Sequence, residues 1–360
     1  MVNHLKSAVV SVSSTSLTDE EKRVLSKFNP LGVTLFQRNI ENKEQTKNII
    51  KEIKETLERD DVLICVDQEG GRVARFKPPY FRSYLSQRSI GAIADFKLKQ
   101  RAAYLHALLI ADELKEMGVF VNYAPCIDVL YEETANVLKT RCFSGDEEEV
   151  TLLAKEMICA YKKMGVVPCL KHVPGHGRTL LDPHLDLPRI DVEYSHLKKD
   201  FYPFKELANL TPMMMTAHIV LSCIDDRPIT QSKKAIDEIV RKDIGFDGFL
   251  ISDAIDMKAL TGSISEKTKN TLEAGCDAVC YCMGKIDEMY QVLETATYLS
   301  DKSFERYEKL TQWFKKEKDL SILESDVLEY DVISKQAPSF LDDYDAVEIL
   351  HHLNGDINCK

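Results

Sequence analysis

The sequence predicts a (β/α)8 barrel with a short C-terminal helical and tail extension, and three observations favour this fold class. Short apolar segments recur along the 360 residues. Helical patterns separate most of them, which is typical of parallel sheets, and the repeats span the length that such barrels need. No glycine-rich phosphate loop follows an early segment, which argues against an open doubly wound sheet. We expect a catalytic barrel over residues 1–318 and an extension over residues 319–360.

Eight segments are predicted to be buried strands, because each is short, apolar and rich in branched side chains. In chain order they are Ala8–Val12, Gly32–Phe36, Val62–Val66, Val119–Tyr123, Val166–Leu170, Pro212–Thr216, Gly248–Ser252 and Asp277–Cys282.

Helices are predicted where apolar residues recur at helical spacing between these strands. In Glu41–Arg59, for example, Ile49, Ile53 and Leu57 share one face. Pro203 makes Tyr194–Leu207 the weakest case, because proline starts, bends or ends a helix. The other expected helices are Thr18–Phe28, Leu98–Met117, Glu147–Met164, Lys233–Lys242 and Lys285–Leu299.

Composition limits the partners of the chain. Its 58 acidic residues outnumber 47 basic ones, for a net charge of -11, which argues against a nucleic-acid or anionic-membrane partner. No apolar run approaches the ~20 residues that span a bilayer, and the first residues lack the pattern of a secretory signal. We expect a cytoplasmic monomer, and we expect neither a cofactor nor a metal.

The ten cysteines are expected to be reduced and mostly buried, as in a cytoplasmic protein. Those within apolar runs include Cys65, Cys126, Cys159, Cys169 and Cys280. A metal site at Cys276, Cys280 and Cys282 is disfavoured, because no histidine or fourth cysteine accompanies them.

Polar residues follow six successive predicted strands at their carboxyl ends. These ends meet at one mouth of a barrel, where catalytic groups lie, so they predict a polar pocket that suits a ligand with many hydroxyls, such as a sugar. The residues are Gln37–Asn39, Asp67–Arg72, Asn122 with Asp128, Lys171 with His172 and His176, Thr216 with His218, and Ser252 with Asp253.

The long segment 171–190 is a further candidate, since loops of this length are usually functional. It contains Asp182 and His184, and a carboxylate beside an imidazole can orient the ring for proton transfer. Such a triplet also arises by chance. Asp253 is ambiguous alone, because an aspartate after a strand is often a helix cap. Its place at the mouth beside Asp67 and Lys171 favours chemistry.

These residues carry a resemblance to glycoside hydrolase family three, within it to the single-domain bacterial β-N-acetylglucosaminidases. The resemblance covers about residues 6–285, and its motifs occur in the family's order. They are Gly32–Asn39, Asp67–Phe76, Asn122–Val129, Lys171–Gly177, Asp182–His184, Thr216–His218 and Ile251–Asp253.

The resemblance implies a retaining exo-glycosidase that removes a terminal N-acetylglucosamine. Asp253 would be the nucleophile, and His184, held by Asp182, the acid and base. It also implies N-acetylglucosaminyl-anhydromuramyl fragments of the cell wall as substrates, recycled in the cytoplasm. The residues implied to bind the sugar are Asp67, Arg75, Arg141, Lys171 and His172.

Some positions depart from the family pattern or keep a structural alternative. The loop reads Asp-Pro-His where the family has Asp-Ser-His, and Pro183 stiffens it. Glu69 and Arg72 have a structural alternative to sugar binding, which is an ion pair beneath the pocket. For His176, His218 and Asp128 a structural role is favoured.

Three other functions stay open at this point. A β-glucosidase or β-xylosidase of the same family would carry an extra domain that supplies its acid. A catalytically silent sugar-binding barrel would lack Asp253 or His184. A metal-dependent hydrolase would need ligands such as His-x-His, whereas His172 and His176 lie in a Pro/Gly loop.

Overall fold

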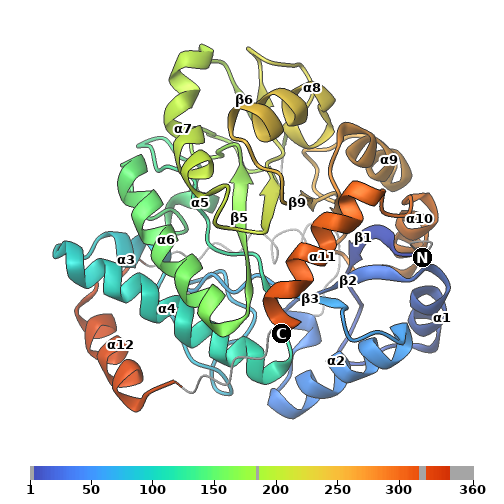
Figure 1. Ribbon diagram of the computed structural model, residues 1–360, viewed down its shortest axis with the longest axis horizontal. Helices are drawn as coiled ribbons and strands as arrows, with labels where there is room; N and C mark the ends of the chain where they lie inside the picture. The colour runs from blue at the N-terminus through green and yellow to red at the C-terminus, as the bar shows by residue number, and fades with distance from the viewer. Residues whose placement is uncertain (1–3, 184–185, 316–321, 341–360) are drawn as a thin grey trace.

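The structure, a computed structural model, describes residues 4–183, 186–315 and 322–340, and its centre is a closed barrel of parallel strands (Figure 1). The order around the barrel is β1-β10-β9-β7-β5-β4-β3-β2, which confirms the predicted fold class. The strands are β1 Lys6–Val10, β2 Pro30–Leu35, β3 Leu63–Val66, β4 Val121–Asn122, β5 Val167–Val173, β7 Met213–Thr216, β9 Phe249–Ala254 and β10 Ala278–Cys280. A separate parallel pair, β6 Arg189–Ile190 and β8 Val220–Leu221, lies outside it.

Side chains alternate along each strand between the barrel interior and the helical shell. Val9, Cys65 and Ile251 belong to the cluster inside the barrel. Their neighbours Ala8 and Ile64 belong to the larger cluster that packs against the helices. A residue two positions beyond an inward side chain therefore also points inward, which decides what reaches the mouth.

Helices surround the barrel, as Figure 1 shows. Thr18 caps α1 in a capping box with Glu21, and α7 continues through Pro203. The predicted helix at Lys233–Lys242 is a short α8 that runs into a π-helical segment, Ile236–Asp243. The bounds are α1 Asp19–Phe28, α2 Lys43–Leu57, α3 Gln87–Gly91, α4 Phe96–Met117, α5 Asn136–Lys139, α6 Glu147–Met164, α7 Tyr194–Leu207, α8 Lys233–Ala235, α9 Ile264–Ala274, α10 Ile286–Thr295, α11 Asp301–Lys315 and α12 Glu324–Gln336, with 3-10 turns at Gln37–Asn39 and Ile229–Gln231.

Four helices of the barrel unit, α3, α5, α9 and α11, are not among those that the sequence predicted. The predicted helix Lys285–Leu299 ends four residues early, because α10 stops at Thr295. Leu299 then donates its N–H to the carbonyl of Leu5, 3.0 Å away, so the chain turns toward β1. The expected boundary at residue 318 lies outside the described residues.

Among the described residues, no helix is both long and apolar enough to cross a membrane. The cysteines of the described part are free thiols. Cys65, Cys126, Cys169 and Cys280 are buried as expected, whereas Cys159 is exposed, so its expected burial was wrong. Cys159 lies on α6 just after Met157 and Ile158, which are buried; its apolar neighbours did not reveal the outward face of that helix.

Candidate active site

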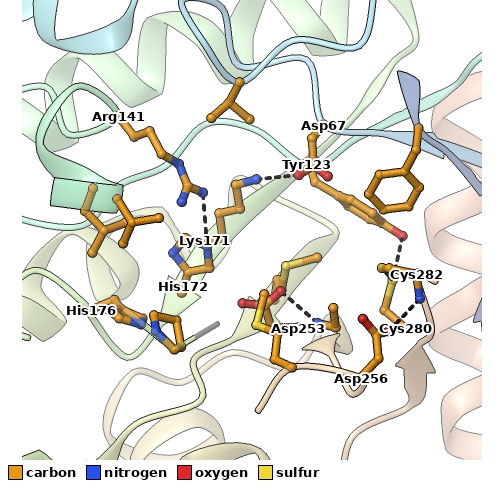
Figure 2. A pocket seen from close by; sticks show the side chains of 18 of the residues that line it. Asp67, Tyr123, Arg141, Lys171, His172, His176, Asp253, Asp256, Cys280 and Cys282 are labelled. Carbon is orange, nitrogen blue, oxygen red and sulfur yellow. Dashed lines mark hydrogen bonds and ion pairs between the residues drawn. The ribbon is translucent and has the colours of Figure 1, made fainter. Parts of the chain in front are cut away.

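A pocket opens at the carboxyl ends of the strands, where the sequence predicted it (Figure 2). Its lining includes six of the eight predicted site residues: Asp67, Arg75, Arg141, Lys171, His172 and Asp253. Asp182 is described and partly buried, and Pro183 beside it lines the pocket. His184 lies outside the described residues.

Strand register places these side chains in the pocket. Pairing sets Lys171 beside Met215, and Met215 beside Ile251. Met215 and Ile251 face the barrel interior, so Lys171 faces it as well. Asp253 follows Ile251 by two residues and keeps the same direction one layer higher. The same logic applies to Asp67, two residues after the inward Cys65. The barrel itself therefore brings these groups together.

A buried ion-pair network forms the polar wall of the pocket. The Lys171 ammonium lies 2.7 Å from an Asp67 oxygen and 2.6 Å from Glu69 Oε1. The Arg141 guanidinium binds Glu69 through both its Nε and Nη2 groups, at 3.0 and 2.8 Å. Glu69 is only 1% exposed, so it holds Lys171 and Arg141 from beneath. Arg72 donates to the Val137 carbonyl and to the Thr140 hydroxyl.

Charge pairing overrides burial within this network. Burial alone raises the pKa of Glu69, but Arg141 and Lys171 outweigh it and hold that pKa far below its usual range. Burial likewise lowers the pKa of Lys171, and the carboxylates of Asp67 and Glu69 outweigh it and raise the pKa. Glu69 and Lys171 therefore both stay charged at neutral pH. The remaining N–H groups can serve as donors to a bound ligand.

His172 is held in one tautomer by its two neighbours. Its Nδ1 lies 2.7 Å from an oxygen of the buried Asp128, and its Nε2 lies 3.2 Å from Arg141 Nη2. Since a guanidinium can only donate, Nε2 accepts and Nδ1 carries the hydrogen. Burial raises the pKa of Asp128, but His172 outweighs it, and the net pKa is about 2. Asp128 is thus a supporting residue, as expected.

Cys126, Asp128 and His172 are also close enough for their ligand atoms to hold a metal ion. Hydrogen bonds already occupy these atoms, however. Cys126 Sγ donates to Asp128 Oδ2 at 3.3 Å, and that same oxygen accepts from His172 Nδ1. The buried set therefore works as a hydrogen-bonded support for the pocket.

Asp253 lies at the end of β9 and is 9% exposed. Its Oδ1 accepts the N–H of Ala254 at 2.8 Å. The carbonyl of Ala254 is held as well, because it lies 2.9 Å from His218 Nε2. His218 thus positions the backbone beside Asp253 and supports the site, as the sequence suggested. A fixed carboxylate at the pocket floor can act as a nucleophile or a base.

Several lining residues were missed by the sequence reasoning. Phe36 and Tyr123 give the pocket aromatic surface, and Asp256, Met257 and Cys282 line it beyond β9 and β10. Figure 2 shows Asp256 beside Asp253, below Cys280 and Cys282. Tyr123 could have been found from strand alternation, since Val121 faces the interior. Asp256 carried no such signal, because it follows the strand in a loop.

Comparison with known proteins identifies the family of this chain. The profile of the glycosyl hydrolase family 3 N terminal domain matches residues 3–309. The chain belongs to glycosyl hydrolase family 3. The prediction of a glycoside hydrolase is thereby confirmed, and so is the resemblance found in the motifs.

Several curated relatives within family 3 are covered over most of their length. One named beta-hexosaminidase from Alkalilimnicola ehrlichii is 35% identical over 280 residues, which are 76% of this chain and 80% of that protein. A beta-hexosaminidase from Haemophilus influenzae is 31% identical, over 81% of this chain and 83% of that one. The family 3 fold also matches the solved structure of NagZ from Neisseria gonorrhoeae in complex with N-trifluoroacetyl-D-glucosamine. That match has a TM-score of 0.82 at 28% identity, covering 94% of this chain and 100% of the other.

Proposed function

We propose that this family 3 member is a retaining exo-β-N-acetylglucosaminidase. The observation that carries the proposal is the position of Asp253, a fixed carboxylate on the floor of a pocket whose wall holds Lys171, Arg141 and Asp67. Such a wall suits sugar hydroxyls, and Asp253 is placed to meet the reacting carbon. The relatives named beta-hexosaminidase, and the NagZ complex with N-trifluoroacetyl-D-glucosamine, support an N-acylated sugar.

The proposed reaction has two steps. An Asp253 oxygen attacks the anomeric carbon, the glycosidic C–O bond breaks, and the leaving oxygen takes a proton from His184. Water then attacks the glycosyl-enzyme, gives its proton to His184 and releases Asp253, so the configuration is retained. Asp182 would orient the imidazole. The roles of His184 and Asp182 rest on the sequence resemblance.

The other predicted residues would bind the sugar. Asp67 would accept hydrogen bonds from hydroxyl groups beside the Lys171 ammonium, which donates to it at 2.7 Å. Arg75 lies 3.6 Å from the second Asp67 oxygen and adds a donor. Arg141 would use N–H groups that Glu69 and His172 leave available. In this proposal, these contacts would bind one terminal sugar, as an exo-acting enzyme requires.

The proposal includes a substrate and a setting. The substrates would be N-acetylglucosaminyl-anhydromuramyl fragments, the enzyme a cytoplasmic monomer, and its role the recycling of peptidoglycan. We further propose some phosphorolysis. A neutral imidazole adds no negative charge beside the glycosyl-enzyme, so phosphate is repelled less than it would be by a second carboxylate. Product analysis with and without phosphate tests this point, and the absence of sugar-1-phosphate removes it.

An assay on an aryl N-acetyl-β-glucosaminide beside the matching aryl β-glucoside tests the activity. We expect faster turnover of the N-acetylated substrate, and Asp253→Ala should lower kcat by at least about 10³-fold because the covalent step is lost. Equal or better turnover of the glucoside would contradict the substrate. A fully active Asp253→Ala variant would contradict the mechanism, and an inactive wild-type chain would favour a silent sugar-binding barrel.

A further inference from the structure

Within the part of the chain that the structure describes, a histidine nitrogen in the pocket wall has no hydrogen-bond partner. His176 lines the pocket and is 2% exposed, and its Nε2 atom is buried without a partner. Buried polar atoms in native proteins are nearly always paired, so such an atom calls for an explanation. Figure 2 places His176 on the side of the pocket that holds His172 and Arg141, opposite Cys280 and Cys282.

The tautomer of His176 follows from its other contacts. The hydroxyl of Thr179 donates to the His176 carbonyl at 2.9 Å and also lies 2.7 Å from His176 Nδ1. A hydroxyl has a single hydrogen, so the ring must donate from Nδ1. Burial lowers the pKa of His176 to about 4, which keeps the ring neutral. Nε2 therefore presents a lone pair and works only as an acceptor.

The ring is rigidly placed, so this acceptor has a fixed direction. The backbone N–H of His176 donates to Asp128 Oδ1 at 2.7 Å. Thr179 is fully buried and binds the Ala135 N–H through its carbonyl at 2.8 Å. At Gly177 a Cβ would lie 1.7 Å from Val129 O, so the backbone there is packed against its neighbour. The loop cannot easily turn the ring toward another partner.

We infer that His176 Nε2 accepts a hydrogen bond from the donor on the second carbon of the bound sugar, which is the acetamido N–H in N-acetylglucosamine. This inference rests on the proposed function. Asp253 must approach the anomeric carbon, and Asp253 and His176 line the same pocket. The substituent next to that carbon is thus the sugar donor nearest to Asp253, inside the pocket that His176 also lines. An uncharged acceptor suits an amide N–H, which brings no charge of its own.

Two variants separate the acceptor from the shape of the ring. His176→Phe keeps a flat ring and removes the acceptor, whereas His176→Gln can place an amide oxygen near the position of Nε2. Both are assayed on an aryl N-acetyl-β-glucosaminide and on the matching aryl 2-deoxy-β-glucoside, which lacks the donor. The aryl group has no hydroxyl, so a contact with the leaving group cannot cause the effect.

We expect His176→Phe to lower kcat/KM about 10- to 100-fold on the N-acetylated substrate and much less on the 2-deoxy substrate. His176→Gln should recover part of the loss. An equal loss on both substrates, or none on either, overturns the inference while leaving the proposed function intact. The proposed function itself fails separately, if the wild-type enzyme does not prefer the N-acetylated sugar.

The wild-type protein gives a readout that does not depend on the folding of variants. With ¹⁵N-labelled histidine, the His176 Nε2 resonance should be that of an unprotonated nitrogen in the free enzyme. Adding N-acetylglucosamine should move it toward the position of a hydrogen-bonded nitrogen. A protonated Nε2 in the free enzyme, or no change on saturation with the sugar, overturns the inference.

Discussion

Glu69 shows how one buried side chain can organise a binding site that it does not line. A lone buried carboxylate is strongly disfavoured, but paired cations with good geometry offset that cost. Glu69 meets Arg141 through a two-point contact and Lys171 at 2.6 Å. Lys171 is thereby held between Glu69 and Asp67, and Arg141 between Glu69 and His172. The site is therefore preorganised by charges that lie beneath the sugar.

We predict that replacing Asp256 with asparagine stabilises the protein at neutral pH. Burial raises its pKa from 3.8 to about 6, against the hydrogen bond from the Cys282 N–H. The folded state thus binds a proton more tightly than the unfolded chain does. Stability must then fall as the pH rises from about 4 to 6, and it stays lower above that window. Asp256→Asn removes this fall, because an amide can accept the same N–H without a charge.

We expect Asp256→Asn to raise the free energy of unfolding by about 3 kcal/mol at pH 7 and to change it little at pH 4. Urea denaturation across this pH range measures the difference. A variant that is less stable than the wild type at pH 7 would show that the Asp256 charge is stabilised by its surroundings, which contradicts the prediction.

The contrast between Asp253 and Asp256 shows which site residues the sequence could predict. Asp253, Lys171 and Asp67 follow apolar strands, so the barrel geometry alone directs them to the mouth. Asp256 and Cys282 reach the pocket from loops, and the Cys282 N–H meets Asp256 Oδ1 across two different strand ends. Such a contact depends on how loops pack, which no local pattern records.

Among the elements, α11 has a role that its sequence did not reveal. Its residues Tyr307 and Leu310 join the cluster inside the barrel, together with Leu31 and Leu63 at the amino ends of β2 and β3. The Tyr307 hydroxyl donates to the Asp61 carbonyl at 2.7 Å, just before β3. The helix thus closes the end of the barrel opposite the pocket. For the preceding helix, α10, the apolar spacing continues past Thr295. The helix nevertheless ends there, because the following residues contact β1.

Arg306 attaches α11 to the barrel, and its removal is predicted to destabilise the protein without affecting catalysis. Its guanidinium lies 2.9 Å from an oxygen of Asp277, which is 3% exposed. In Arg306→Met, Asp277 keeps Arg241 but loses one of its two cations. We expect the free energy of unfolding to fall by about 3 kcal/mol, measured by urea denaturation, with kcat unchanged.

Lys302 on the same helix provides the matched control. It pairs with Asp247 at 3.2 Å, but both side chains are more than half exposed. Exposed pairs contribute little, so Lys302→Met should cost less than about 1 kcal/mol. Equal effects of the two variants would mean that burial of the Asp277 pair does not matter. A large loss of kcat in Arg306→Met would mean that α11 communicates with the pocket.

At the scale of the whole molecule, α12 connects the C-terminal part of the chain to the site. The Leu85 N–H donates to the Tyr330 hydroxyl at 3.2 Å. That hydroxyl lies 2.9 Å from His106 Nδ1, and His106 Nε2 lies 2.8 Å from the Glu69 carbonyl. A carbonyl only accepts, so Nε2 donates to it, and Nδ1 accepts from Tyr330. Burial lowers the pKa of His106 to about 4, which keeps the ring neutral.

The sequence predicted the barrel as a whole better than it predicted this connection. Repeated apolar strands and helices carry a periodic signal, and the closed barrel follows from it. The contacts that link α12 through α4 to the loop at Glu69 have no periodic signal in the sequence, because α12 and α4 are joined by residues more than 200 positions apart. We propose that α12 unfolds together with the barrel, although the sequence suggested an appended segment.

Tyr330→Phe tests this proposal with the loss of one oxygen. Without the hydroxyl, His106 Nδ1 loses its donor and the Leu85 N–H loses its acceptor inside the protein. An unpaired buried group costs about 1–3 kcal/mol, so we expect a fall of this size in the free energy of unfolding, with a single cooperative transition. Leu328→Ser on the same helix is the control. Leu328 is 58% exposed, so its change should stay within about 0.5 kcal/mol. If instead Tyr330→Phe leaves the main transition unmoved, α12 is an independent appendage, and the hydrogen-bonded connection to Glu69 adds nothing to the stability of the barrel.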